Sequence, residues 1–442
     1  MNYYDCILKN GDVFTGGLVR LKTDIGIKKD KIAFIGNINK KNGKEVHDLS
    51  NLTVLPGCID SQVHFREPGL THKEDISTGT KGAILGGITS IFEMPNTKPT
   101  TTSQEAFNNK IKIASNKSYC NFAFYIGANK ENIEKLHILE KSKGCPGIKI
   151  FVGSSTGDLL VEDDLNLERI MKAVTRIIAI HSEDEYRLRK RKWILGSTNS
   201  TVYDHPIWRD SISAIESTKR LIRIAKKVKK QIHILHISTK EEIELIGKNK
   251  DFVTCEATPQ HLFFKSPDCY KKIGTLSQMN PPIRGKKHQD GIWKGVTKRI
   301  IDVIGSDHAP HTLEEKLRKY PLSPSGMTGV QTLVPIMLNF VNKKKIGIED
   351  FVRLTSSNPA KIFNILGKGE IKVGNDADFT VVDLMKKKKI ENSWIASKSG
   401  WTPYDGELVT GWPAKTIING KFVMSDDQII GKPQGKEIKF NF

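Results

Sequence analysis

Cysteine is scarce in this sequence and never forms a paired motif. No two of the six cysteines stand in a CxxC arrangement. This excludes a structural zinc ribbon and gives no basis for a disulfide framework, so we expect reduced thiols and a cytoplasmic protein. The six positions are Cys6, Cys58, Cys120, Cys145, Cys255 and Cys269.

Long apolar runs are also missing. No stretch of 18 or more apolar residues occurs, so the sequence predicts no transmembrane helix. The first residues lack a basic segment followed by an apolar one, and we expect no secretory signal. With 442 residues, of which 38% are hydrophobic, the chain is long enough for one large domain and a smaller one.

Acidic residues are outnumbered by basic ones. The 49 Asp and Glu against 69 Lys and Arg give a net charge of +20. Such a charge raises the question of a nucleic-acid or membrane partner. However, the lysines lie in short scattered runs, such as 343–345 and 386–389, without interleaved aromatic residues. We interpret them as solvated surface, and expect neither nucleic acid nor membrane as a partner.

Eight short apolar runs follow one another along the middle of the chain. Amphipathic segments such as 211–229 and 239–248 lie between several of them. Strands that alternate with helices indicate the α/β class and a parallel sheet. Eight such units over about 300 residues predict a closed (β/α)8 TIM barrel. The runs are Thr53–His64, Ile88–Asn96, Tyr119–Ala128, Gly147–Val152, Arg176–Glu183, Gln231–Ser238, Phe252–Pro259 and Ile300–Pro310.

Both ends of the chain have a different pattern, with short apolar runs separated by glycine and Asn-Gly turn signals. The Asn419-Gly420 pair between two apolar runs is typical of a hairpin. Neither end has enough strands to bury a core alone. We therefore expect residues 1–52 and 367–442 to form one small β-sandwich domain beside a barrel of residues 53–366. The runs are Asp5–Lys9, Val13–Phe14, Ile32–Ile35, Phe379–Asp383, Ala414–Ile418 and Lys421–Met424.

Side chains able to bind a metal stand at the carboxyl ends of five predicted strands. Active sites of these barrels lie at that face, and five separate occurrences are hard to explain as packing. In the first strand, alternation places Gln62 and His64 on one face. The candidates are Gln62, His64, Lys149, His181, His236 and Asp307. By the same alternation His233 faces away from His236, and we interpret it as structural.

Two of these residues allow more than one interpretation. Lys149 lies inside the apolar run Gly147–Val152, where a charged amine is costly to bury. It either snorkels from a strand end or is carboxylated by CO2, so that its carbamate bridges two cations. Asp307 either forms an Asx-turn or acts at a metal, where a carboxylate can ligate the ion and move a proton.

The ordered set of motifs resembles the amidohydrolase superfamily and, within it, the dihydroorotase family. The resemblance covers nearly the whole chain. Its motifs are Val63–Gly69 (VHFREPG), Met94–Thr97 (MPNT), Gly147–Lys149 (GIK), Leu235–Thr239 (LHIST), Asn280–Arg284 (NPPIR), Ser306–His311 (SDHAPH), Asn358–Ala360 (NPA) and Gly374–Asp378 (GNDAD).

The resemblance implies the reversible hydrolysis of the cyclic amide of (S)-dihydroorotate to N-carbamoyl-L-aspartate in pyrimidine synthesis. It implies one or two zinc ions that activate a hydroxide. His64 would hold one ion, carboxylated Lys149 would bridge both, and His181 with His236 would hold the other. Asp307 would be a ligand and the general base, and would then protonate the leaving ring nitrogen.

The resemblance also implies a binding site for the substrate carboxylate. Arg66, Asn96 and His311 match the positions with this role, and an Arg fork can donate two parallel hydrogen bonds to a carboxylate. Asn280 would contact the ring. From the residues alone, the alternatives are that Arg66 forms a surface ion pair and that Asn280 is a turn residue before two prolines.

The sequence departs from the family at Gln62, where a first histidine of a His-x-His motif is usual. A neutral amide oxygen is a poorer zinc ligand than an imidazole. One alternative is therefore a non-catalytic partner of aspartate transcarbamoylase, and another is a hydantoinase or allantoinase type of cyclic amidase. A homodimer stays open as well.

Overall fold

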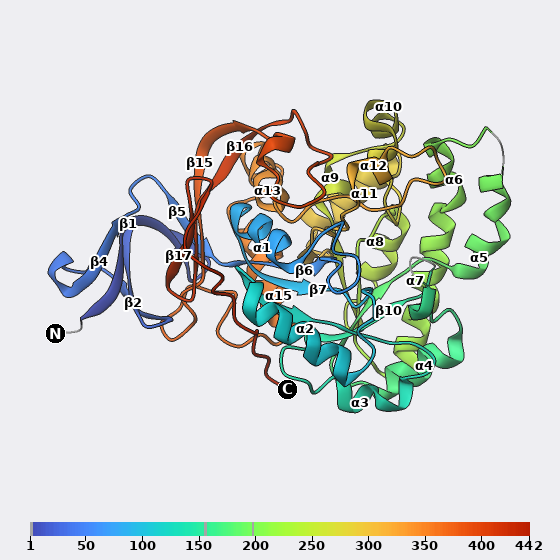
Figure 1. Cartoon of the computed structure of the whole chain (residues 1–442), viewed down its shortest axis with the longest axis horizontal. Helices are drawn as coiled ribbons and strands as arrows, with labels where there is room; N and C mark the ends of the chain where they lie inside the picture. Colours follow the sequence, from blue (N-terminus) through green and yellow to red (C-terminus); the bar gives the residue numbers. More distant parts are fainter. Residues whose placement is uncertain (1–2, 154–156, 197–198) are drawn as a thin grey trace.

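The computed structural model describes residues 3–153, 157–196 and 199–442. Figure 1 shows a barrel of strands and helices with a β domain beside it that carries the N-terminus. One large apolar core lies mainly between the strands and helices of the barrel, and a smaller one lies in the β domain around Leu8, Ile25 and Phe379. The expected fold class is confirmed.

The barrel strands pair in parallel and in chain order. β8 and β9 are two pieces of one strand interrupted at Tyr125, and a bridge between Val63 and His308 closes the circle. All eight predicted runs therefore contain barrel strands. The strands are β6 (Cys58–Val63), β7 (Ile88–Glu93), β8 (Asn121–Phe124), β9 (Ile126–Gly127), β10 (Gly147–Phe151), β11 (Ile177–His181), β12 (Ile232–Ile234), β13 (Val253–Ala257) and β14 (Val303–Ile304).

Helices surround these strands (Figure 1). The longest, α7 (Ser211–Val228), begins at Asp210, which accepts a hydrogen bond from the Ser213 backbone, and buries an apolar stripe that includes Leu221 and Ala225. Other helices of eight or more residues are α1 (Ile76–Leu85), α2 (Gln104–Lys117), α4 (Asp164–Ala173), α8 (Lys240–Gly247), α11 (Lys286–Thr297) and α13 (Leu333–Asn342).

Shorter helices lie in the loops. They are α3 (Leu136–Leu139), α5 (Glu185–Lys190), α6 (His205–Trp208), α9 (Pro259–Phe263), α10 (Asp268–Ile273), α12 (Leu313–Lys316), α14 (Ile348–Val352) and α15 (Asn358–Ile362). Several of them, including α6 and α12, follow the carboxyl ends of barrel strands, where connecting segments carry functional residues.

The β domain is one nine-stranded sheet that both ends of the chain build together, in the order β18-β17-β16-β15-β5-β1-β2-β3, with β4 beside β1. Because the two ends pair through β5 and β15, neither end forms the domain alone. The strands are β1 (Tyr4–Thr15), β2 (Leu18–Lys28), β3 (Lys31–Gly36), β4 (Gly43–Asp48), β5 (Thr53–Pro56), β15 (Phe379–Lys389), β16 (Leu408–Ile418), β17 (Lys421–Ser425) and β18 (Gln428–Ile429).

Two local expectations differ from the structure, and one agrees. The run expected to open the barrel at Thr53 divides at Gly57, and its first part, β5, pairs with β1 and β15. Asn10 and Gly11 lie inside β1 at a register shift instead of in a turn. Asn419 and Gly420 do form the predicted hairpin turn, since both have positive φ, of 51° and 78°.

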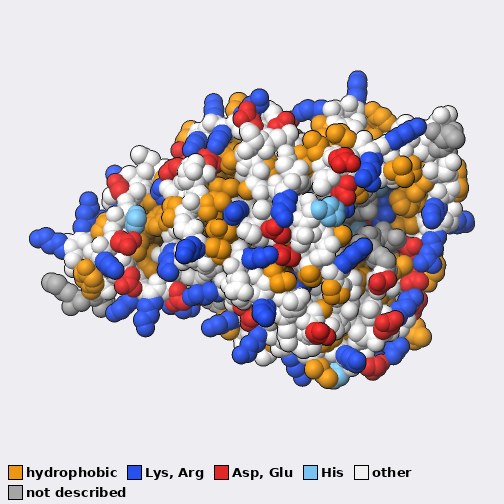
Figure 2. All heavy atoms as spheres, in the orientation of Figure 1, with side chains coloured by type: hydrophobic (Ala, Val, Ile, Leu, Met, Phe, Trp, Pro, Cys, Tyr) orange, Lys and Arg blue, Asp and Glu red, His pale blue; other side chains and the backbone are white. Residues whose placement is uncertain are grey.

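The surface agrees with the interpretation of the excess charge. Figure 2 shows Lys and Arg side chains spread over the whole visible face, with acidic side chains among them. Among the helices of the described residues, none is both long and apolar enough to cross a membrane.

Candidate active site

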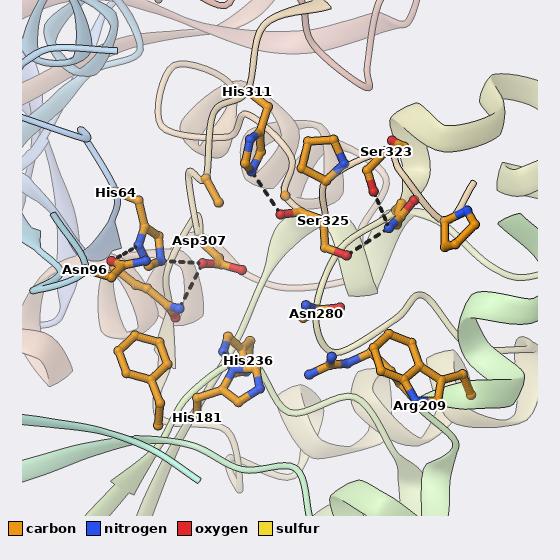
Figure 3. A pocket seen from close by; sticks show the side chains of 18 of the residues that line it. His64, Asn96, His181, Arg209, His236, Asn280, Asp307, His311, Ser323 and Ser325 are labelled. Atoms are coloured by element: carbon orange, nitrogen blue, oxygen red, sulfur yellow. Dashed lines mark hydrogen bonds and ion pairs between the residues drawn. The ribbon is translucent and has the colours of Figure 1, made fainter. Parts of the chain in front are cut away.

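A cavity of about 380 Å³ opens at the carboxyl ends of the barrel strands. All ten residues that the sequence singled out as ligands or substrate contacts line it. Figure 3 shows His64, Asn96 and Asp307 gathered on one side and His181 next to His236 below them. The ten are Gln62, His64, Arg66, Asn96, Lys149, His181, His236, Asn280, Asp307 and His311.

The backbone turns sharply where several of these side chains leave the strands. Arg66, His236 and Asp307 all have positive φ, of 63°, 36° and 45°. Residues other than glycine rarely adopt this conformation, and such strain clusters at functional sites because the surrounding structure holds it. The three residues follow β6, β12 and β14, so each strand ends by turning a polar side chain into the cavity.

We call the first group of residues the histidine corner: His181, His236 and Lys149. Nδ1 of His181 lies 3.0 Å from Nε2 of His236. Nε2 of His181 lies 2.9 Å from Oε2 of Glu183, which also accepts a 2.6 Å hydrogen bond from Arg209. Because a carboxylate only accepts hydrogen bonds, the His181 proton is on Nε2 and the Nδ1 lone pair faces His236.

The Glu183 carboxylate stays charged because of its neighbours. Burial raises its pKa, but the Arg209 guanidinium and His181 lower it more, so the pKa stays well below its ordinary value. A carboxylate behind a histidine fixes the ring orientation of metal-binding histidines in many proteins. Glu183 therefore gives the histidine corner the hydrogen-bonded carboxylate that commonly orients a metal-binding histidine.

Lys149 is buried, with 1% of its surface exposed, and lines the same cavity as the two histidines. Its Nζ has no hydrogen-bond partner among the described residues and lies 4.4 Å from the centre of the Phe151 ring. Burial lowers the pKa of Lys149 to about 7. A snorkelling lysine would reach solvent, so that interpretation is wrong. An amine that has no hydrogen-bond partner among the described residues, shares a cavity with two histidines and is partly neutral at pH 7 fits a lysine that is modified when a cation binds.

We call the second group the aspartate corner: Asp307, His64 and Gln62. Oδ1 of Asp307 accepts a 2.9 Å hydrogen bond from Nε2 of Gln62 and lies 3.2 Å from Nε2 of His64. Nδ1 of His64 lies 2.7 Å from Oδ1 of Asn96. Burial lowers the pKa of His64, while Asp307 opposes this shift. Both contacts with Asp307 are made at Oδ1, which leaves Oδ2 for a proton.

The metal-competent side chains come together in pairs. Within the part of the chain that the structure describes, no three His, Cys, Asp or Glu side chains form a group that could hold a metal ion. A third ligand must come from Lys149 at the histidine corner or from Gln62 at the aspartate corner. The residues thus fit a cation best at the histidine corner, where the unpartnered Nζ of Lys149 is available.

A buried cationic side chain, Arg66, lines the same cavity. Arg66 is 6% exposed, so the alternative of a surface ion pair is wrong. Its Nε donates to the Pro310 carbonyl at 3.3 Å. Burial lowers the pKa of Arg66 to about 10, which leaves the guanidinium charged at neutral pH. An anionic substrate group in this cavity would meet a desolvated Arg.

His311 and Asn280 are held in place by neighbours. Nδ1 of His311 lies 3.0 Å from Nζ of Lys73, and its Nε2 lies 3.1 Å from the Ser325 carbonyl. Burial, Arg66 and Lys73 keep the pKa of His311 well below its ordinary value, so the ring is neutral. Oδ1 of Asn280 lies 3.0 Å from Nε2 of His205, which leaves the amide nitrogen of Asn280 to donate elsewhere.

His233 lies away from this cavity. Its Nδ1 is 2.8 Å from Oγ1 of Thr254, and its ring packs against Phe363. This placement agrees with the structural role expected from strand alternation.

Sequence reasoning missed the residues that support the site. Glu183 follows His181 by two positions, so strand alternation could have placed it on the same side. Arg209 and His205 lie in or beside α6 and give no periodic signal. Tyr320 and Ser325 line the cavity from the loop after α12.

The fold and this cavity define an amidohydrolase. Residues 53–423 match the amidohydrolase family. Among solved structures, the L-hydantoinase (dihydropyrimidinase) of Arthrobacter aurescens has a TM-score of 0.94 at 27% identity, and covers 99% of this chain and 100% of its own. The dihydropyrimidinase of Brevibacillus agri has a TM-score of 0.89 at 26% identity, and covers 97% and 96%.

Relatives of higher sequence identity include several dihydroorotases. The dihydroorotase of Pyrococcus abyssi is 35% identical over 98% of this chain and 96% of its own length. That of Methanosarcina acetivorans is 34% identical over 97% and 94%. The chain therefore belongs to the dihydroorotase family of amidohydrolases.

Proposed function

We propose that the protein is a cytoplasmic enzyme that reversibly hydrolyses the cyclic amide of (S)-dihydroorotate to N-carbamoyl-L-aspartate. The relatives named dihydroorotase support the reaction. The observation that carries the proposal is the joint presence of Asp307, the histidine pair and the buried Arg66 in one cavity. A proton acceptor, a cation site and a carboxylate partner are the three parts that this reaction needs.

Zinc is the cation that the donor set favours, since neutral imidazoles are common zinc ligands. His181, His236 and Lys149 as a carbamate would hold it, and His64 and Asp307 are the family positions for a second ion. When bound, the cation polarises the amide carbonyl and lowers the pKa of water to about 7. The neutral amine of Lys149 is the form that reacts with CO2.

Asp307 is proposed to move the proton. Gln62 and His64 fix its Oδ1, so the carboxylate plane is held and Oδ2 faces the reaction. Oδ2 takes a proton from the attacking water and returns it to the ring nitrogen when the amide bond breaks. The reverse transfers serve cyclisation, and the proton count balances in both directions.

Arg66 is proposed to bind the substrate carboxylate, with His311 and Asn96 beside it. The Arg66 guanidinium is buried and has two long contacts, from Nε to the Pro310 carbonyl at 3.3 Å and from Nη2 to Nε2 of His311 at 3.4 Å. A carboxylate would give it the charged partner that these contacts lack. The amide nitrogen of Asn280 would donate to a carbonyl of the ring. Hydantoin and dihydrouracil lack this carboxylate and would leave Arg66 unpaired, which is an effective basis for rejection.

The experiment is a comparison of turnover for dihydroorotate, dihydrouracil, hydantoin and allantoin on one zinc-loaded preparation. We expect turnover of dihydroorotate above all others. Preferred turnover of hydantoin or dihydrouracil would support the alternative suggested by the structural neighbours. Absence of any turnover would support the non-catalytic partner of aspartate transcarbamoylase, and gel filtration with and without that enzyme would test this association and a homodimer.

A further inference from the structure

We infer that the protein holds one cation per chain, at the histidine corner, and that the amide of Gln62 replaces a second cation by hydrogen bonding to Asp307. This inference rests on the proposed function, because it concerns the same cavity. It differs from the two-ion site that the family resemblance implies. Its basis is the unequal construction of the two corners.

The histidine corner has nearly the spacing of two ligands on one ion. The two ring nitrogens that face each other are 3.0 Å apart. Two nitrogens at about 2.0–2.1 Å from a tetrahedral zinc would be separated by about 3.3 Å. A shift of a few tenths of an ångström would therefore seat the ion, once the proton of His236 moves from Nε2 to Nδ1, which has no hydrogen-bond partner among the described residues. The Glu183–Arg209 pair already fixes the lone pair of His181 in the required direction.

The aspartate corner is arranged for a hydrogen bond. A carboxylate only accepts, and the amide nitrogen is the only donor of a glutamine side chain. The 2.9 Å contact therefore presents the Gln62 nitrogen to Asp307 and turns its Oε1 away. This Oε1 is buried and has no hydrogen-bond partner among the described residues. In this orientation it cannot share an ion with Oδ1 of Asp307.

A flipped amide would be needed for Gln62 to act as a ligand. The flip would break the hydrogen bond and set a neutral oxygen beside the carboxylate oxygen, where both are acceptors. Only a firmly bound ion would offset this arrangement, and an amide oxygen is a weaker zinc ligand than the imidazole it replaces. With the Lys149 carbamate assigned to the histidine corner, only His64 and Asp307 remain, and two side chains fall short of the three that protein zinc sites use.

The replacement also has a consequence for the reaction. An Asp307 that does not ligate an ion keeps its Oδ2 as a basic oxygen, and the Gln62 amide supplies the orientation that the ion would otherwise give. The aspartate corner would then transfer the proton, and the histidine corner would bind the cation. In a two-ion site the same carboxylate would have to do both.

The test is the metal content of the whole enzyme after zinc loading and gel filtration, measured by elemental mass spectrometry together with dihydroorotate turnover. We expect one zinc per chain in the wild type and two in Gln62→His, where an imidazole completes the second ligand set. The matched control Gln62→Ala removes the amide without adding a ligand and should keep one zinc. Manganese-loaded enzyme gives a second measurement, because electron paramagnetic resonance separates an isolated ion from a coupled pair.

Two zinc ions in the wild type, with one lost in Gln62→Ala, would overturn the inference by making Gln62 a ligand. Two zinc ions in both proteins, or a coupled manganese pair in the wild type, would overturn it as well. If Gln62→His does not fold, the wild type and Gln62→Ala decide the question. Two ions with dihydroorotate turnover would refute only this inference, whereas absence of turnover at full zinc loading would refute the proposed function.

Discussion

The two corners of the cavity use similar residue types for different tasks. At the histidine corner, a fully buried ion pair, Glu183 with Arg209, stands behind the ring of His181. At the aspartate corner, two neutral amides, Gln62 and Asn96, contact Asp307 and His64. A charged support raises the basicity of a ligand, and a neutral support orients an acid–base group without adding charge.

This difference suggests a division of labour at the rim of the barrel, with cation binding at one corner and proton transfer at the other. Several strand ends contribute polar side chains to the same cavity, so the role of each side chain depends on the residues behind it. Changes that affect one corner and spare the other test the division.

The largest expected effect is at Asp307. Asp307→Asn keeps the shape and the contacts at this corner but removes the proton acceptor, so we expect kcat to fall by about 10²–10⁴-fold. Steady-state turnover of dihydroorotate measures it, and thermal unfolding shows that the fold is kept. Zinc content should stay at the wild-type value. Turnover close to that of the wild type would remove Asp307 from the proton transfer.

The next effect concerns the carboxylate partner. Arg66→Ala should weaken dihydroorotate binding by about 2–5 kcal/mol, the range for one partner lost from a buried charged pair. Arg66→Lys is the matched control, and should recover only part of the affinity because an ammonium lacks the planar fork. Inhibition constants of dihydroorotate analogues with and without the carboxylate measure the effect. An equal loss for both analogues would argue against this contact.

A smaller effect is expected from the support of the histidine corner. Glu183→Gln keeps the size of the side chain but removes the charge behind His181, so cation affinity should fall by about 10–100-fold. Competition with a chromogenic zinc chelator measures the affinity. Asn96→Ala is the comparison at the aspartate corner and should leave cation affinity nearly unchanged. Equal losses in the two variants would contradict the division between the corners.

The last prediction concerns the pH dependence of the free energy of unfolding and not activity or binding. Burial, followed by Arg209, lowers the pKa of His205 from 6.5 to about 3. The folded protein therefore binds fewer protons at His205 than the unfolded chain between pH 3 and 6.5. The contribution of the neutral His205 to the free energy of unfolding is therefore complete above about pH 6.5. It is lost as the pH falls towards 3, by about 1.4 kcal/mol per pH unit at most.

His205→Gln keeps a donor towards Asn280 and removes the titration. Urea unfolding from pH 4 to 7 should then show a shallower loss of stability on the acid side than in the wild type. Parallel curves for the two proteins would show that His205 does not set this dependence.

Much of the site could be predicted because barrel strands end at one rim. Alternation along the first strand placed Gln62 and His64 in one cavity, and the carboxyl ends of the other strands brought Lys149, His236 and Asp307 to them. These features depend on local spacing and on fold class, and both can be extracted from the order of residues.

The remaining features depend on partners distant in the chain. Whether residues 53–56 belong to the barrel or to the β domain is decided by their pairing with β15. The direction of the Gln62 amide is set by Asp307, 245 positions away. The burial of Arg209 against Glu183 follows from the placement of α6. No periodicity encodes such contacts, so the sequence could raise the question of Gln62 but could not answer it.

The central claim is that this cavity uses a bound cation to hydrolyse dihydroorotate, and removal and return of the metal tests it most directly. Dialysis against a chelator should abolish dihydroorotate turnover, and stoichiometric zinc should restore it in proportion to the ion bound. Full turnover in a chelated sample with no detectable metal would contradict the account.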